Sequence, residues 1–106
     1  MNTLFIDTTS NQEVTAVLTV NGEKDIITRP LERQKAQIVL PILESLLEKH
    51  ALTLHDLDSI EVNPGPGSFT GVRVGVSIAN ALSFSLGIPV NNILVAKEDT
   101  AVDPVY

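Results

Sequence analysis

The segment best suited to chemistry is a glycine-rich turn in the second half of the chain, with the sequence Gly65-Pro66-Gly67-Ser68-Phe69-Thr70-Gly71-Val72-Arg73-Val74-Gly75. Placed before a helix, such a turn points backbone N–H groups at one spot and so favours an anion such as phosphate. It is not a Walker A loop, because valine and arginine follow Gly71, and Thr70 departs from the dinucleotide-binding fingerprint. On spacing alone we favour a structural interpretation, in which a tight turn lets a helix approach a sheet closely.

A second candidate site is the polar triplet Asp7-Thr8-Thr9, which follows the first apolar run of the chain. One carboxylate and two hydroxyls could hold the phosphate of a metal-bound nucleotide, but these residue types more commonly cap turns at strand ends. The two histidines, His50 and His55, are five residues apart and form no HExxH motif, so we predict no metal site. We also predict no catalytic residues, since the chain has no nucleophile elbow of the G-x-S-x-G type.

Four small residues, Gly67, Gly71, Gly75 and Ala79, recur every four positions and so share one side of a helix. A side without bulk lets another backbone pack closely, either the protein's own first helix or sheet, or a helix of a partner. Because this segment is apolar around most of its circumference, we expect one sheet face to leave part of it uncovered, which favours a partner. The candidate interface residues on the two predicted helices are Leu40, Leu43, Leu47, Gly71, Val72, Arg73, Gly75, Val76, Ala79 and Leu82.

The first elements that must position these residues are strands. Residues 3–8 and 14–20 are apolar runs rich in β-branched residues, separated by the turn-forming Ser10-Asn11-Gln12. Asn21-Gly22 tolerates positive φ at both positions, as a type I′ hairpin turn requires, and leads into the alternating residues 25–28. These patterns predict a meander of three antiparallel strands.

The remainder of the chain alternates between helical and extended patterns. From Leu31 onward, apolar residues recur every three or four positions, which predicts an amphipathic helix with a kink at Pro41. Residues 57–62 form a short apolar strand, which the glycine-rich turn follows. Residues 72–86 predict a second helix that is closed by Gly87.

The element order is βββαβαβ, with residues 93–96 as the last strand. Right-handed crossovers place strands four and five parallel to strand one, so we predict an α/β fold with two helices and a mixed five-stranded sheet of order 3-2-1-4-5. We assign residues 1–96 to one lobe. Residues 97–106 are acidic and without periodicity, and we expect a tail that is loose or docks on a partner.

Composition limits the classes of function. The 106 residues are 43% hydrophobic, enough for one core, and the absence of cysteine excludes disulfides and thiolate chemistry. Thirteen acidic against seven basic residues give a formal net charge of -6, the wrong sign for a surface that holds a phosphate backbone by itself. We find neither a signal peptide nor an apolar run long enough to span a bilayer. We therefore expect a cytoplasmic protein without membrane contact.

The glycine-rich segment closely resembles the signature of the TsaB (YeaZ) family, a partner subunit in bacterial threonylcarbamoyladenosine modification of tRNA. Further similarity extends over residues 1–96. Phe5-Ile6-Asp7-Thr8 resembles the family's first strand, Ile38-Val39-Leu40-Pro41 its first helix, and Leu86-Gly87-Ile88-Pro89-Val90 the end of its second helix. The resemblance implies a single actin-like lobe of the ASKHA, RNase H-like type, equivalent to the family's N-terminal lobe.

This resemblance also implies a function. The chain would be a non-catalytic scaffold whose two helices bind TsaD, the subunit that transfers the threonylcarbamoyl group, or a second copy of the chain, and tRNA would be contacted only indirectly. Asp7, Thr8 and Thr9 would then be a vestigial phosphate loop, with no cofactor on the isolated chain and ATP or ADP only at the interface of a complex. The alternative is a small ATP-binding enzyme or regulator, whose actin-like cleft is completed by dimerisation. A third hypothesis, a peptidase, has no supporting motif.

Overall fold

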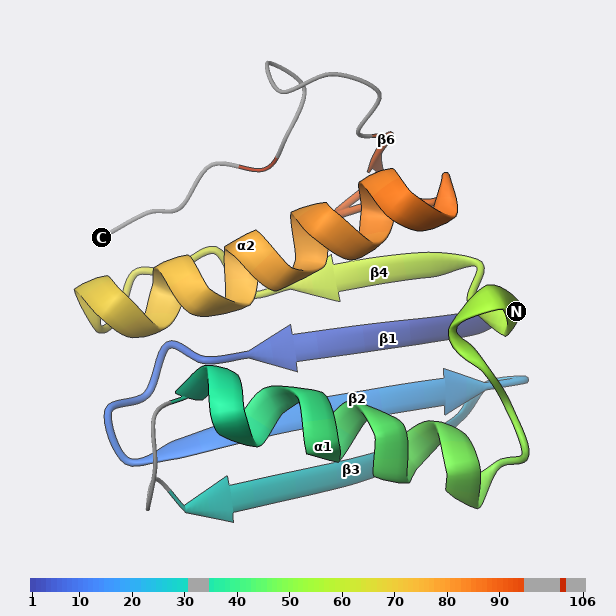
Figure 1. Cartoon of the computed structure of the whole chain (residues 1–106), viewed down its shortest axis with the longest axis horizontal. Coiled ribbons are helices and arrows are strands. Elements are labelled where there is room, and N and C mark those ends of the chain that lie inside the picture. The colour runs from blue at the N-terminus through green and yellow to red at the C-terminus, as the bar shows by residue number, and fades with distance from the viewer. Residues whose placement is uncertain (31–34, 95–101, 103–106) are drawn as a thin grey trace.

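The chain folds into two layers, a sheet and a pair of helices that lie on the same face of it (Figure 1). The computed structural model describes residues 1–30, 35–94 and 102. In Figure 1 both helices lie in front of the strands, α1 over β2 and β3, and α2 over β1, β4 and β5. The N-terminal half of the sheet is antiparallel, and the connections through the helices make the next strands parallel to the first.

The meander that the sequence predicts is present. It consists of β1 (Asn2–Asp7), β2 (Glu13–Val20) and β3 (Glu23–Pro30), paired antiparallel in the order of the chain. Asn21 and Gly22 have φ values of 51° and 85°, so both occupy the left-handed region that the type I′ turn demands. The hairpin turn expected at these two residues is therefore confirmed.

Helix α1 (Lys35–Lys49) contains Pro41 within its length, so the helix continues through the residue at which we expected a kink. The expected start at Leu31 lies outside the described residues. Helix α2 (Phe69–Leu86) begins three residues earlier than predicted, because Ser68 caps it by accepting a hydrogen bond from the N–H of Gly71. It ends as predicted at Gly87, whose φ of 66° places it in the left-handed conformation of a C-cap.

The sheet order β3-β2-β1-β4-β5 confirms the predicted order 3-2-1-4-5. Strand β4 (Ser59–Val62) follows a short 3-10 helix, η1 (Leu54–Asp56), and pairs parallel to β1. The fifth position is taken by β5 (Pro89–Val90), not by residues 93–96 as we expected, and β6 (Ile93–Leu94) adds a sixth, antiparallel strand.

Two asparagines explain this correction. Asn91 and Asn92 have φ values of 47° and 65° and form a two-residue hairpin turn between β5 and β6. The Asn91 side chain also replaces strand pairing, since its Oδ1 accepts from the Val62 N–H at 2.8 Å and its Nδ2 donates to the Val62 carbonyl at 3.0 Å. One side chain thus completes the hydrogen bonding that a two-residue strand cannot supply.

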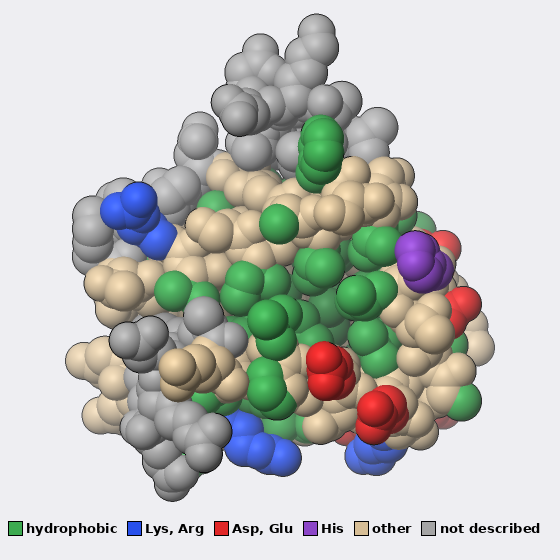
Figure 2. Space-filling model, viewed as in Figure 1, with side chains coloured by type: hydrophobic (Ala, Val, Ile, Leu, Met, Phe, Trp, Pro, Cys, Tyr) green, Lys and Arg blue, Asp and Glu red, His purple; other side chains and the backbone are tan. Residues whose placement is uncertain are grey.

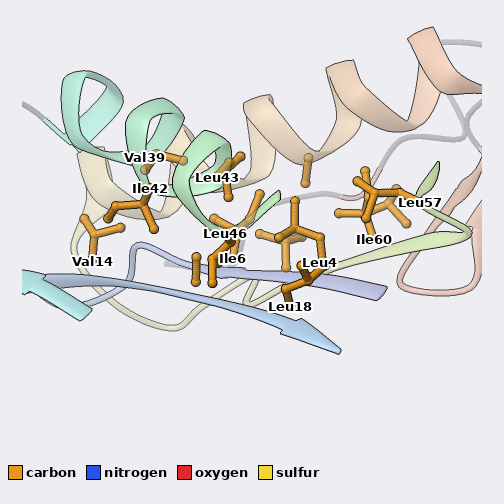
Figure 3. Close-up of a cluster of buried hydrophobic side chains, with 14 of the residues drawn as sticks. Leu4, Ile6, Val14, Leu18, Val39, Ile42, Leu43, Leu46, Leu57 and Ile60 are labelled. Carbon is orange, nitrogen blue, oxygen red and sulfur yellow. The ribbon is translucent and has the colours of Figure 1, made fainter. Parts of the chain in front are cut away.

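The core lies between the two layers (Figure 3). Every second residue of the central strands points at the helices, as the two-residue period of a strand requires, and meets the apolar side of α1. The labelled side chains of Figure 3 are Leu4, Ile6, Val14 and Leu18 from β1 and β2, Val39, Ile42, Leu43 and Leu46 from α1, and Ile60 of β4 beside Leu57.

The predicted boundary between lobe and tail lies outside the described residues. Val102 is the one described residue of the expected tail, and it is buried. Asn80 of α2 holds its backbone, donating from Nδ2 to the Val102 carbonyl at 2.9 Å and accepting the Val102 N–H at 3.0 Å. Of the helices that the structure describes, none combines the length and the apolar character needed to cross a bilayer.

Candidate functional site

Two places carry the residues that the sequence analysis singled out. The first is the end of β1, where the chain leaves the sheet through Asp7, Thr8 and Thr9. Asp7 is half-buried, and its Oδ1 accepts from the backbone N–H of Thr9 at 2.9 Å and from the Thr9 hydroxyl at 2.7 Å. Its other oxygen accepts from Nδ2 of Asn63 at 3.2 Å. The carboxylate therefore ties the end of β1 to the loop that follows β4.

The glycine-rich turn lies directly against this end of β1. The backbone N–H of Ser68 donates to the Thr9 carbonyl at 3.0 Å, and a Cβ on Gly67 would come within 2.6 Å of the Thr9 Cβ. Contacts that short do not occur between real side chains, so only glycine fits at position 67. The turn that could have cradled a phosphate is packed instead against its own chain.

Thr8 joins the same end of β1 to helix α2. It is fully buried, and its hydroxyl donates to the Gly71 carbonyl and accepts from the Gly75 N–H at 3.0 Å. A Cβ on Gly75 would collide with the Thr8 hydroxyl oxygen. The small-residue side of α2 therefore faces the protein's own sheet, which is the structural interpretation of the motif.

This packing corrects our expectation that the stripe faces a partner. Because the apolar side of an amphipathic helix is buried first against its own sheet, most of the expected interface residues lie in the core. Among the ten candidates, the buried ones are Leu43, Leu47, Gly71, Val72, Gly75, Val76 and Ala79. Leu40 is 51% exposed, Arg73 is exposed, and Leu82 is partly buried.

The apolar surface that remains is the second place of interest. Figure 2 shows hydrophobic side chains gathered on the helix-bearing face of the molecule. The most exposed are Phe84, at 63%, and Leu40, at 51%, and partly buried Ile38, Ile78 and Leu82 also pack against the core. The sequence analysis did not include Phe84 among the candidate interface residues. Phe84 follows the buried Ser83, and the helical turn of about 100° between them points Phe84 away from the core.

Ionisable groups gather at the C-terminal end of α1. Asp25 on β3 pairs with Nζ of Lys49 at 3.0 Å and with Nε2 of His50 at 3.0 Å. The hydrogen bond from His50, followed by that from Lys49, lowers the pKa of the Asp25 carboxyl below its ordinary value. His55 is exposed, and within the described residues no three His, Asp or Glu side chains gather as a metal site would require.

Comparison with known proteins gives a consistent picture. The family model of TsaD, tRNA N6-adenosine threonylcarbamoyltransferase, matches residues 23–95. The tRNA threonylcarbamoyladenosine biosynthesis protein TsaB of Haemophilus influenzae is 38% identical over 88 residues, which are 83% of this chain and 37% of that protein. TsaB of Escherichia coli is 32% identical over 89 residues, 84% of this chain and 38% of the relative.

A solved structure agrees. YeaZ from Pseudomonas aeruginosa superposes with a TM-score of 0.79 at 31% identity, over 84% of this chain and 41% of that one. Sheet order and structural likeness together define an actin-like, RNase H-like lobe. The chain belongs to the TsaB (YeaZ) family. It spans less than half the length of the relatives named above.

Proposed function

We propose that this lobe is a non-catalytic interaction module of the tRNA threonylcarbamoyladenosine machinery, and that it binds a TsaD-like subunit or a second copy of itself through its helix-bearing face. Under this proposal the partner contacts the tRNA, because a chain with a formal charge of -6 lacks the cations that hold a phosphate backbone. Family membership supports the pathway, and the exposed residues of α1 and α2 support the mode of binding.

The observation that carries the proposal is the exposure of two large apolar side chains on the helices. Leu40 and Phe84 are each more than half exposed, whereas most of the other large apolar side chains of α1 and α2 are buried or partly buried in the core. Burying the part of these two side chains that is still exposed contributes roughly 1 to 2 kcal/mol each at an interface. The helices also carry the partly buried Ile38, Ile78 and Leu82, which pack against the core.

The end of β1 supports the non-catalytic part of the proposal. Both oxygens of Asp7 accept hydrogen bonds from the chain, and Thr8 is buried beneath helix α2. Side chains whose polar atoms are already hydrogen-bonded to their own chain hold the lobe together. The proposal therefore assigns Asp7, Thr8 and Thr9 a structural role, as the remnant of a phosphate loop.

The test measures association by light scattering, with the chain alone and mixed with a TsaD from the same source. We expect the wild type to form a complex of higher mass. The variants Leu40→Glu and Phe84→Glu should weaken it at least tenfold, because a carboxylate at an apolar interface loses its hydration. Ile26→Glu is the matched control. The Ile26 side chain is 59% exposed, but it lies on the face of the sheet opposite the helices.

Circular dichroism checks that each variant is folded. The proposal fails if the wild type stays monomeric and does not bind TsaD, or if Leu40→Glu and Phe84→Glu bind as well as the wild type. It also fails if Ile26→Glu alone abolishes the complex, since that result would place the contact on the sheet.

A further inference from the structure

The turn between β2 and β3 holds the one asparagine of the chain that glycine follows, Asn21-Gly22 (Figure 1). The side-chain amide of asparagine is chemically labile, because the backbone nitrogen of the next residue can attack it. Glycine obstructs that attack least, since it has no Cβ. The other six asparagines are each followed by a residue with a side chain. The sequence therefore makes Asn21 the most reactive asparagine.

Both reacting groups of this pair are accessible in the folded chain. Asn21 and Gly22 are exposed, and a Cβ built on Gly22 would meet nothing within 4 Å. Among the described residues, none hydrogen-bonds to the Asn21 side chain, to the Asn21 carbonyl or to the Gly22 N–H. The fold thus neither covers the two groups nor ties them in place.

The conformation of the turn is close to the one that ring closure requires. Asn21 already has a positive φ of 51°, which the type I′ and type II′ hairpin turns share at this position. The two turns differ by a rotation of the peptide between the central residues, which takes ψ of Asn21 to about −120° in type II′. This rotation brings the Gly22 nitrogen to the side of the Asn21 side chain, and it breaks no hydrogen bond among the described residues.

We propose that Asn21 is a site of spontaneous deamidation in the folded protein. Hydroxide removes the proton of the Gly22 N–H, and the nitrogen attacks Cγ of Asn21 to form a C–N bond. Nδ2 takes a proton from water, the Cγ–Nδ2 bond breaks, and ammonia leaves a succinimide ring. Water then opens the ring at either carbonyl, to aspartate or to isoaspartate. Each product adds a negative charge to a chain whose formal net charge is -6.

The two products have different effects on the hairpin. Aspartate before glycine favours the type I′ turn as asparagine does, so this product keeps the turn. In isoaspartate the main chain runs through the side-chain methylene, which lengthens a two-residue loop that fixes the register of β2 and β3. Strand β3 also carries Asp25, which holds Lys49 and His50 at the end of α1. Isoaspartate therefore weakens the attachment of α1 as well as the hairpin.

Asn91 is a matched control within the chain. It too begins a two-residue hairpin turn, with a φ of 47°. Its amide, however, accepts from the Val62 N–H at 2.8 Å and donates to the Val62 carbonyl at 3.0 Å, and the next residue, Asn92, carries a Cβ. If turn geometry alone were sufficient, both asparagines would react, whereas we expect reaction at Asn21 only.

The test incubates the folded chain at mildly acidic and mildly alkaline pH, and a second sample unfolded in guanidinium. Peptide mass spectrometry follows each asparagine, and an isoaspartyl methyltransferase labels isoaspartate. We expect Asn21 to convert at least tenfold faster than Asn91, and faster at the higher pH because hydroxide starts the reaction. Gly22→Asn copies the Asn91-Asn92 turn and should slow the conversion at least tenfold while the hairpin forms, since asparagine tolerates positive φ.

Urea denaturation of the separated products measures the structural effect. Asn21→Asp should unfold at the same urea concentration as the wild type, and the isoaspartate form at a lower one. The inference is overturned if Asn21 stays intact in the folded chain while it converts in the unfolded chain, or if Asn91 reacts as fast. It is also overturned if Gly22→Asn leaves the rate unchanged. No partner takes part in this test, so its outcome is independent of the proposed function.

Discussion

At the scale of single residues, the glycine-rich motif is explained by two close approaches. Gly67 lies against Thr9 and Gly75 against Thr8, so two turns of the motif are held to the end of one strand. The hydroxyl of Thr8 links two backbone groups of α2, at Gly71 and Gly75. The spacing of four residues that is typical of a helix–helix contact here serves a contact between a helix and a strand end.

Gly75→Ala tests this contact. Alanine is the better helix former by up to about 1 kcal/mol, but its Cβ would overlap the Thr8 hydroxyl, and overpacking of this kind costs about 1 to 3 kcal/mol. We therefore expect a net loss in the free energy of unfolding, measured by urea denaturation. In a Thr8→Ala background the overlap is gone, so Gly75→Ala should become neutral or stabilising.

Ser77→Ala, on the exposed side of the same helix, is the control and should change stability by less than about 0.5 kcal/mol. Equal effects of Gly75→Ala in both backgrounds would show that Thr8 is not the residue it meets.

At the scale of elements, α1 is held to the sheet by its apolar side and, at its C-terminal end, by Asp25. Lys49 and His50 reach down from the helix to that carboxylate on β3. Lys49 also lies in the last turn of α1, where a positive charge is favourable. The end of α1 and the edge of the sheet are thus joined by charge.

The lowered pKa of Asp25 predicts a dependence of stability on pH. Its carboxyl has an ordinary value of 3.8, and the hydrogen bonds from His50 and Lys49 favour the ionised form in the folded state. The unfolded chain then takes up a proton first as the pH falls, so the stabilisation is present above 3.8 and is lost as the pH falls through the lower, folded value.

Denaturation from pH 6 to pH 2 measures this dependence. Asp25→Asn should be less stable than the wild type above pH 4 and should lose less stability on acidification, so the two curves should converge. Parallel curves over the whole range would rule out a contribution from this carboxylate.

At the scale of the whole molecule, both described helices pack on one face of the sheet, and the residues of the predicted phosphate site lie at the end of β1. An enclosed site buries most of a small ligand between walls, whereas the end of β1 offers one carboxylate that its own chain already engages. We expect the isolated chain to bind ATP more weakly than millimolar in titration calorimetry, with or without magnesium. Saturable binding at micromolar ATP would favour the hypothesis of an enzyme or regulator.

Local patterns in the sequence were sufficient to predict the main strands and helices and their order in the sheet. The turn at Asn21-Gly22, the cap at Gly87 and the order of the sheet depend on backbone conformation and on short connections, which neighbouring residues determine. The hairpin at Asn91 and Asn92 was missed by the prediction, although two such residues between short apolar pairs favour a type I′ turn.

Only the tertiary structure decided which way each surface faces. The spacing of Gly71, Gly75 and Ala79 establishes one helical side but not what lies against it, and packing placed the end of β1 there; Gly67 precedes the helix and meets the same strand end from the turn. The apolar residues Phe5, Val17 and Ile26 come from three strands and become neighbours only once the register of those strands is set. A sequence encodes periodicity along the chain, whereas a surface joins residues that are distant in the chain, and their arrangement depends on the packing of the whole fold.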